Sequence, residues 1–286
     1  MRTLMTRPAP APAAPRLQSI LDDVERVRPL PTSVTRVIQA LEDPAVDAEY
    51  IAHLLGLDQA LAADVLRLSN AAALAGVSAT ASVHEAVVRL GFKRVKALAL
   101  GAATATLLTR RLGGYGLSGG ELWNHSVETA SLARYVAEAV GFRDQEEAYV
   151  AGLLHDIGKL ILDQYVKVGQ QVLADLMVRN QWQLWQAEEH VFGMDHGAVG
   201  GRMAEKWQFP IGLADAIRCH HWPSLSRTRP ELAAIVNVAD ALPGRKRSSL
   251  GLLGSPRVHP EALRILHLDE TRFARLRLEM PWQPGV

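Results

Sequence analysis

The stretch VAGLLHDIGKLIL, residues 150–162, combines a helical apolar pattern with a charged side chain on its apolar side. Asp156 stands three residues after Leu153 and four before Leu160, so a helix places its carboxylate beside the row that faces the core. Burying a carboxylate is costly unless a partner compensates its charge. Apolar residues recur at offsets 0, 3, 4, 7 and 11, at Val150, Leu153, Leu154, Ile157 and Ile161. The stretch therefore predicts a buried helical segment whose aspartate needs a positive partner.

Two further segments show the same conflict between a polar side chain and an apolar helix face. Asp240 stands four residues after Val236, at the end of a helical stripe, and His125 stands seven residues before Leu132 on another. Buried carboxylates and imidazoles that converge are typical of a divalent cation site, because the cation supplies the charge that makes their burial tolerable. The alternative is a set of separate core residues, each with its own hydrogen bonds.

Composition and charge describe an ordinary globular chain and exclude several classes. The 286 residues are 48% hydrophobic and 21% charged with a net charge of +1, which excludes disorder over the whole length and gives no global field that attracts nucleic acid. The single cysteine, Cys219, excludes an intrachain disulfide. The N-terminus lacks the apolar core of a signal peptide, and the most apolar later run, residues 97–108, is about half the length of a membrane span. We expect a cytoplasmic protein without membrane contact.

Helical spacing along most of the chain, with no competing strand alternation, predicts an all-α fold of two subdomains packed on each other. The glycine-dense segment LGGYGLSGG, residues 112–120, marks the boundary between them because a helix is hard to sustain there. We expect four parts: a disordered Pro/Ala-rich tail over 1–16, an N-terminal helical subdomain over 17–112, a metal-site subdomain over 113–244, and a basic C-terminal appendage over 245–286.

Several phrases of the sequence resemble known families. The strings WNHS (123–126), LLHDIGKLIL (153–162), IRCHHWP (217–223) and VNVADAL (236–242), in this order along the chain, resemble the HD superfamily of metal-dependent phosphohydrolases. The strings LPTSVTRVIQALEDP (30–44), GLDQALAADVLRLSNAA (56–72) and VHEAVVRLGFKRVKALAL (83–100) are similar to the HDOD family, in which a helical N-terminal half is fused to an HD-like half. The resemblance covers roughly residues 17–243.

The resemblance implies a set of metal ligands in this chain. The set comprises His125, the doublet His155 and Asp156, His196, the pair His220 and His221, and Asp240. Some two-metal relatives also use a glutamate four residues before the first histidine, and Glu121 stands in that place. Glu121 is equally explained as the partner of Ser118 in a helix capping box. The implied cofactor is one or two divalent ions, and the ligand types do not distinguish Fe, Mn, Mg and Zn.

Three functions remain open on the sequence. The first is a bacterial signal-transduction module whose metal-binding pocket senses a small phosphorylated ligand or a protein partner. The second is a phosphohydrolase acting on a nucleotide or related phosphoester, with Asp156 and Lys159 as catalytic residues; Lys159 would neutralise phosphate charge, unless it is simply solvated. Cyclic di-GMP is disfavoured, because HHWPSLSRTRP, residues 220–230, lacks the Gly-Tyr-Pro signature of HD-GYP enzymes.

The third function is a nucleic-acid-binding regulator, since residues 47–72 have the spacing of a helix-turn-helix. Asp58 and Asp64 make its second helix a poor face for phosphates, so nucleic acid is not the expected partner. Whether the protein is an enzyme at all, and its oligomeric state, are left undecided by the sequence.

Overall fold

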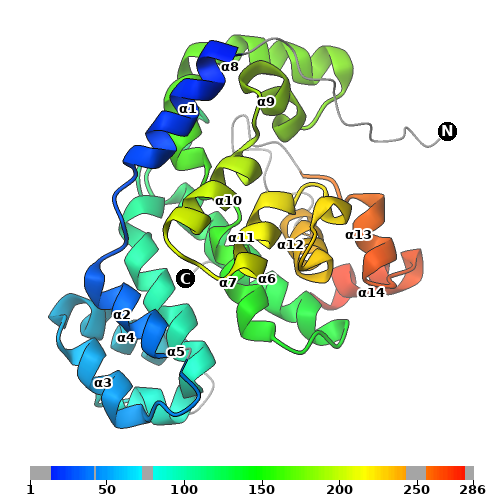
Figure 1. The fold of residues 1–286 in the computed structure, drawn as a ribbon. Coiled ribbons are helices and arrows are strands. Elements are labelled where there is room, and N and C mark those ends of the chain that lie inside the picture. The colour runs from blue at the N-terminus through cyan, green and yellow to red at the C-terminus, as the bar shows by residue number, and fades with distance from the viewer. Residues whose placement is uncertain (1–13, 42, 73–79, 243–255, 281–286) are drawn as a thin grey trace. The chain divides into compact units, whose positions relative to one another are not determined.

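The computed structural model describes residues 14–41, 43–72, 80–242 and 256–280 (Figure 1). Within these ranges the secondary structure is helical, and the β-structure is limited to an isolated bridge between Leu112 and Leu117. The all-α expectation is therefore confirmed. Of the tail expected over residues 1–16, residues 1–13 lie outside the described residues. The first helix begins at Ala14.

The chain divides into two compact units, one of residues 28–107 and one that joins residues 1–27 to residues 108–286. The first unit contains α2 (Thr32–Ala40), α3 (Ala48–Gly56), α4 (Gln59–Ala72) and most of α5 (Val83–Leu108). A non-helical backbone at Gly91, with φ of 74°, kinks α5. The positive φ explains the glycine, because other residues rarely adopt it.

The second unit is formed by the remaining helices, and it contains every residue of the expected metal site. Its elements are α1 (Ala14–Arg26), α6 (Glu121–Ala139), α7 (Gln145–Leu154), α8 (Lys159–Asn180), α9 (Leu184–Phe192), α10 (His196–Lys206), α11 (Ile211–Cys219), the short 3₁₀ helix η1 (Pro223–Leu225), α12 (Pro230–Ala241), α13 (Pro260–Ile265) and α14 (Glu270–Glu279). The domain boundaries expected from the sequence stay a prediction. Within the second unit, α1 packs against α8 and α10.

The core of the second unit is centred on α12, which packs against α6, α7, α11 and α13. Every residue of α12 from Leu232 to Ala241 is buried, so other parts of the protein cover this helix on all sides. Gly152 allows α7 to lie against α6, because a Cβ there would stand 2.8 Å from the Cα of Ala130. Close packing of this kind holds the ends of α6, α7 and α12 near one another.

The C-terminal segment packs on the same core where it is described. α13 contacts α12 and η1, and Tyr135 on α6 donates a hydrogen bond to the carbonyl oxygen of Leu276. Residues 245–255, which carry the basic cluster Arg245, Lys246 and Arg247, lie outside the described residues. Among the described residues no helix combines the length and the apolar content that a membrane crossing requires.

Asp215 on α11 connects this helix to the segment that precedes α12. Its Oδ2 accepts hydrogen bonds from Ser226 Oγ at 2.7 Å, Arg227 N at 2.9 Å, Thr228 Oγ1 at 2.8 Å and Thr228 N at 3.0 Å. Burial alone would raise the pKa of Asp215, but these hydrogen bonds, first that from Ser226, lower the pKa below its ordinary value of 3.8. The carboxylate therefore holds the start of α12 in place.

Replacing Asp215 by asparagine is expected to lower the free energy of unfolding by about 1.5–3 kcal/mol at neutral pH, because hydrogen bonds to a charged acceptor are lost. The pKa is lower in the folded state than in the unfolded state, so this stabilisation is present above the unfolded pKa and is lost as the pH falls through the folded pKa. Urea unfolding of both proteins should show the difference shrinking at acid pH. A difference independent of pH would contradict the assignment.

Candidate metal centre

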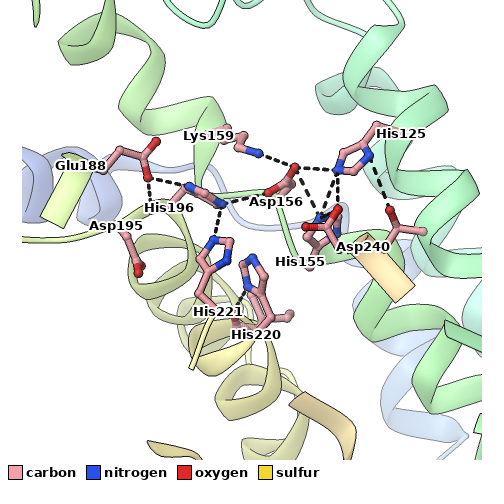
Figure 2. Close-up of polar contacts among 12 residues, drawn as sticks. His125, His155, Asp156, Lys159, Glu188, Asp195, His196, His220, His221 and Asp240 are labelled. Carbon is pink, nitrogen blue, oxygen red and sulfur yellow. Dashed lines mark hydrogen bonds and ion pairs between the residues drawn. The ribbon is translucent and has the colours of Figure 1, made fainter. Parts of the chain in front are cut away.

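The His155–Asp156 doublet occupies the buried turn between α7 and α8 (Figure 2). The His155 Nδ1 donates a hydrogen bond to the carbonyl oxygen of Gly152 at 2.7 Å, one turn earlier. This bond assigns a proton to Nδ1, so in the neutral form of the ring the lone pair lies on Nε2, which faces Asp156 and Asp240. The turn thus presents an imidazole nitrogen and a carboxylate to the same space.

A first group of donors surrounds one oxygen of Asp156. Asp156 Oδ2 lies 2.9 Å from His125 Nε2 on α6 and 3.4 Å from His155 Nε2. Asp240 Oδ1, at the end of α12, lies 3.5 Å from His125 Nε2 and 3.7 Å from His155 Nε2. Three helix ends therefore bring two carboxylates and two imidazoles together, and all four residues are buried.

A second group lies on the other side of the same carboxylate. Asp156 Oδ1 is 3.1 Å from His196 Nε2, at the first residue of α10. His196 Nε2 is 2.7 Å from His221 Nε2, and the donor nitrogens of His196, His220 and His221 lie within 4.8 Å of one another. The His220 Nε2 is buried and has no hydrogen-bond partner among the described residues. Figure 2 shows both groups, with Asp156 between them.

Contacts outside the two groups hold the paired histidines. His220 Nδ1 donates to the carbonyl oxygen of Ile217 at 2.7 Å, and Asn237 Nδ2 on α12 donates to the carbonyl oxygen of His220 at 2.8 Å. Asn237 Oδ1 also accepts from the backbone N–H of His259 at 2.8 Å, just before α13. The ring of Trp185 stacks on that of His221, with centroids 5.6 Å apart. The helix end that carries the pair is thus attached to α12 and α13.

Lys159 and Glu121, the remaining predicted site residues, lie in different surroundings. Lys159 is buried and its Nζ donates to Asp156 Oδ2 at 2.5 Å, so it is not a solvated lysine. The Glu121 carboxylate accepts a hydrogen bond from the backbone N–H of Ser118 at 2.5 Å, the contact expected of a capping glutamate, and Glu121 is absent from the donor clusters found among the described residues. Its role as a ligand stays a prediction that no contact supports.

The electrostatics of the centre are dominated by burial and mutual charge. Burial alone would raise the pKa of Asp156, but the charges of His155 and Lys159 outweigh it and hold the pKa well below its usual range. Burial lowers the pKa of His220 to about 3 and that of His221 well below the ordinary value. For His196 burial would also lower the pKa, but the charge of Glu188 raises it to about 9. Asp156 is thus ionised, and the paired histidines are neutral donors.

Glu188 and Tyr115 belong to the centre and are absent from the sequence prediction. Glu188 on α9 is fully buried, and its Oε2 lies 2.5 Å from His196 Nδ1. The criterion that identifies Asp156 also applies to Glu188, which stands four residues after Leu184 and four before Phe192 on a buried row. The contact with Tyr115, by contrast, joins residues 73 positions apart and has no local signal.

Comparison with protein families settles the family. The HDOD domain pattern matches residues 27–223, which include every predicted ligand except Asp240. The chain belongs to the HDOD family. The family match ends before α12, so the matched range includes the residues of the second donor group and three of the four residues of the first.

Solved structures of HDOD proteins and related proteins agree with this fold. An HDOD domain protein of unknown function from Geobacter sulfurreducens has 27% identity and a TM-score of 0.69, over 95% of this chain and 91% of that one. A putative signal transduction protein from Marinobacter aquaeolei has 25% identity and a TM-score of 0.71, over 93% of this chain and 62% of that one. The HDOD chain is thus similar in structure to an HDOD domain protein and to a putative signal transduction protein.

The chain is also similar over part of its length to curated sequences. Ribonuclease Y of Aquifex aeolicus is 35% identical over 130 residues, which are 44% of this chain and 18% of that protein. The chain spans well under half the length of the curated relatives that it matches.

Proposed function

We propose that this HDOD protein is a signal-transduction module whose HD-like half binds two divalent cations and, through them, a phosphorylated ligand. The observation that carries the proposal is the Asp156 carboxylate, with one oxygen facing His125 and the other facing His196. A carboxylate placed between two groups of imidazole nitrogens is suited to bridge two cations.

The donor set fits a divalent cation on two grounds. The buried His220 Nε2 lacks a hydrogen-bond partner within the described part of the chain, and buried polar atoms of this kind normally have one. The pKa of His220 lies near 3, so a proton does not fill this role at neutral pH. Five imidazoles with two carboxylates and no thiolate suit Fe, Mn or Zn better than Mg, which prefers oxygen. His125, His155, Asp156 and Asp240 would hold one ion, and Asp156, His196, His220 and His221 the other.

The chain's own residues would divide the work around a bound phosphate. A divalent cation, when bound, would supply Lewis acidity to a phosphoryl oxygen and acidify a water molecule. Asp156 supplies the shared negative charge that holds the cations. Lys159, buried beside Asp156, supplies a positive charge that favours an anionic ligand in a site with little water.

Elemental analysis of protein purified without chelator should give close to two transition-metal ions per chain, since a preformed buried donor set binds metal tightly. His221→Ala should reduce the content to about one, because one group loses a donor and the other is intact. His53→Ala is the matched control, since His53 is an exposed histidine outside both groups.

Equilibrium dialysis with inorganic phosphate should then show that the metal-loaded wild type retains phosphate and that chelated protein does not. Wild-type protein that contains no metal even after reconstitution would contradict the proposal.

Hydrolysis of a phosphodiester is the second candidate, favoured by the burial of Lys159 and by the similarity to ribonuclease Y. Lys159→Met keeps the apolar stem and removes the charge that would meet a developing negative charge. If the centre turns over, this variant should lower kcat toward bis-p-nitrophenyl phosphate or an oligoribonucleotide by about 10²–10³-fold. Lys167→Met, at an exposed position of α8, is the control and should have no effect. A loaded wild type without activity would leave the binding module as the function.

A further inference from the structure

Glu188 on α9 forms hydrogen bonds to α10 and to the glycine-dense segment before α6. Its Oε2 accepts hydrogen bonds from the backbone N–H of His196 at 3.0 Å and from His196 Nδ1 at 2.5 Å. Its Oε1 accepts from the Tyr115 hydroxyl at 2.7 Å. Glu188 and Tyr115 are both fully buried, so this carboxylate is held on both oxygens away from solvent.

Three of the other ligand imidazoles have uncharged partners on Nδ1. His155 Nδ1 and His220 Nδ1 each donate to a backbone carbonyl oxygen, and His125 Nδ1 lies 3.5 Å from the hydroxyl of Thr129. Of these four histidines, His196 is therefore the one whose Nδ1 meets a carboxylate. A carboxylate partner makes an imidazole a stronger electron donor than a neutral carbonyl does.

The glycine-dense segment explains how Tyr115 reaches Glu188. Gly114 N donates to Asp163 Oδ1 on α8 at 2.8 Å. A Cβ on Gly114 would stand 2.2 Å from the backbone oxygen of Asp163, so no larger residue fits there. The segment expected to be a subdomain boundary thus lies tightly on α8 and directs Tyr115 inward.

We propose that Glu188, held by Tyr115, is a positioning residue that keeps the Nδ1 proton of His196 toward α9 and turns Nε2 toward Asp156, where a cation would replace the Nε2 proton, and that it so sets the affinity of the second cation group. The inference rests on the proposed metal centre. Glu188 supports one of the two groups, because its hydrogen bonds reach His196 and none of the donors around His125. The two cations should therefore respond differently to its substitution.

The test measures cation affinity by competition titration with Mn²⁺ or Zn²⁺. Glu188→Gln keeps the side-chain shape and one acceptor oxygen for α10, and it should weaken one cation about tenfold or more; Glu188→Ala should weaken it by up to about 100-fold. Tyr115→Phe should produce a smaller loss in the same cation. Glu189→Gln, the adjacent residue on α9, is the matched control and should leave both affinities unchanged.

Two background variants assign the weakened cation. With Asp240→Asn, which removes a donor from the first group, the remaining cation should still lose affinity on Glu188→Gln. With His221→Ala, which removes a donor from the second group, Glu188→Gln should have little further effect. The visible spectrum of Co²⁺-loaded protein gives an independent readout, because it changes with the donor strength of the ligands. If Glu188 has a purely structural role, its substitution should lower the free energy of unfolding without a selective loss of affinity for one cation.

The outcomes separate the two proposals. If the wild type binds two cations and Glu188→Gln binds both as tightly as Glu189→Gln does, the metal centre stands and the role of Glu188 is overturned. If both cations weaken equally, the assignment to the second group is overturned. If the wild type binds no cation after reconstitution, the metal centre itself fails, and this inference fails with it.

Discussion

Asp156→Asn is expected to remove both cations, whereas loss of any other single ligand should remove one. The reason is geometric, because the two oxygens of this carboxylate face the two donor groups, at 2.9 Å from His125 Nε2 and 3.1 Å from His196 Nε2. An amide offers one neutral oxygen and an N–H₂ group that repels a cation. Metal content should therefore fall from close to two ions per chain to nearly none, as measured by elemental analysis after dialysis.

The same substitution also affects folding, and this effect needs to be separated. The buried ammonium of Lys159 loses the carboxylate to which it donates at 2.5 Å, which is expected to cost about 3–5 kcal/mol in the metal-free protein. The double variant Asp156→Asn with Lys159→Met removes the unpaired charge and should recover much of this stability without recovering metal. One ion retained per chain in Asp156→Asn would show that Asp156 does not serve both groups.

Gly158→Ala is expected to lower the free energy of unfolding by about 3 kcal/mol through overpacking. Gly158 follows the His155–Asp156 turn, and a Cβ there would stand 2.0 Å from the carbonyl oxygen of His196 and 2.6 Å from Gly200 N. The obstacle is backbone, which does not rotate away as a side chain does. Its φ of −64° is ordinary for any residue, so the expected cost is steric.

To make room for the added Cβ, the turn that carries Asp156 must move away from the start of α10. This movement also separates the two donor groups. We therefore expect Gly158→Ala to lose cation affinity as well as stability, measured by urea unfolding and competition titration. Gly113→Ala is the matched control, since a Cβ there meets nothing within 4 Å. Equal stability of the two variants would contradict the close approach of the turn to α10.

Local periodicity accounts for the parts of the centre that the sequence predicts. A helix repeats every 3.6 residues, so the positions of Asp240 and His125 relative to apolar neighbours identify a carboxylate and an imidazole that lie on core-facing rows. Asp156 is buried as expected, but it lies in the turn between α7 and α8, so the continuous helix predicted over residues 150–162 is interrupted there. The same periodicity, together with the absence of strand alternation, predicts the all-α fold that the structure confirms. These inferences need no knowledge of how the helices pack, because they concern one helix at a time.

The resemblance to the HD superfamily adds the histidines that periodicity leaves out. His196 and His220 carry no strong local signal, since an imidazole at a helix end has many ordinary explanations. The structure brings both close to Asp156, and their role as ligands stays a proposal until metal is measured. Glu121 shows the limit of motif position, because its carboxylate accepts from the backbone N–H of Ser118, whereas the N-cap of α6 is Gly120 and the expected hydrogen bond to the Ser118 side chain is not formed.

What the sequence by itself determined is the helical class and the identity of buried groups that need compensation. What only the tertiary structure decided is which groups meet: that the two oxygens of Asp156 face different histidines, and that Tyr115 from a glycine-dense segment supports Glu188 on another helix. The physical reason is that helical periodicity specifies a direction from each helix axis, whereas convergence depends on the packing of helices far apart in the chain.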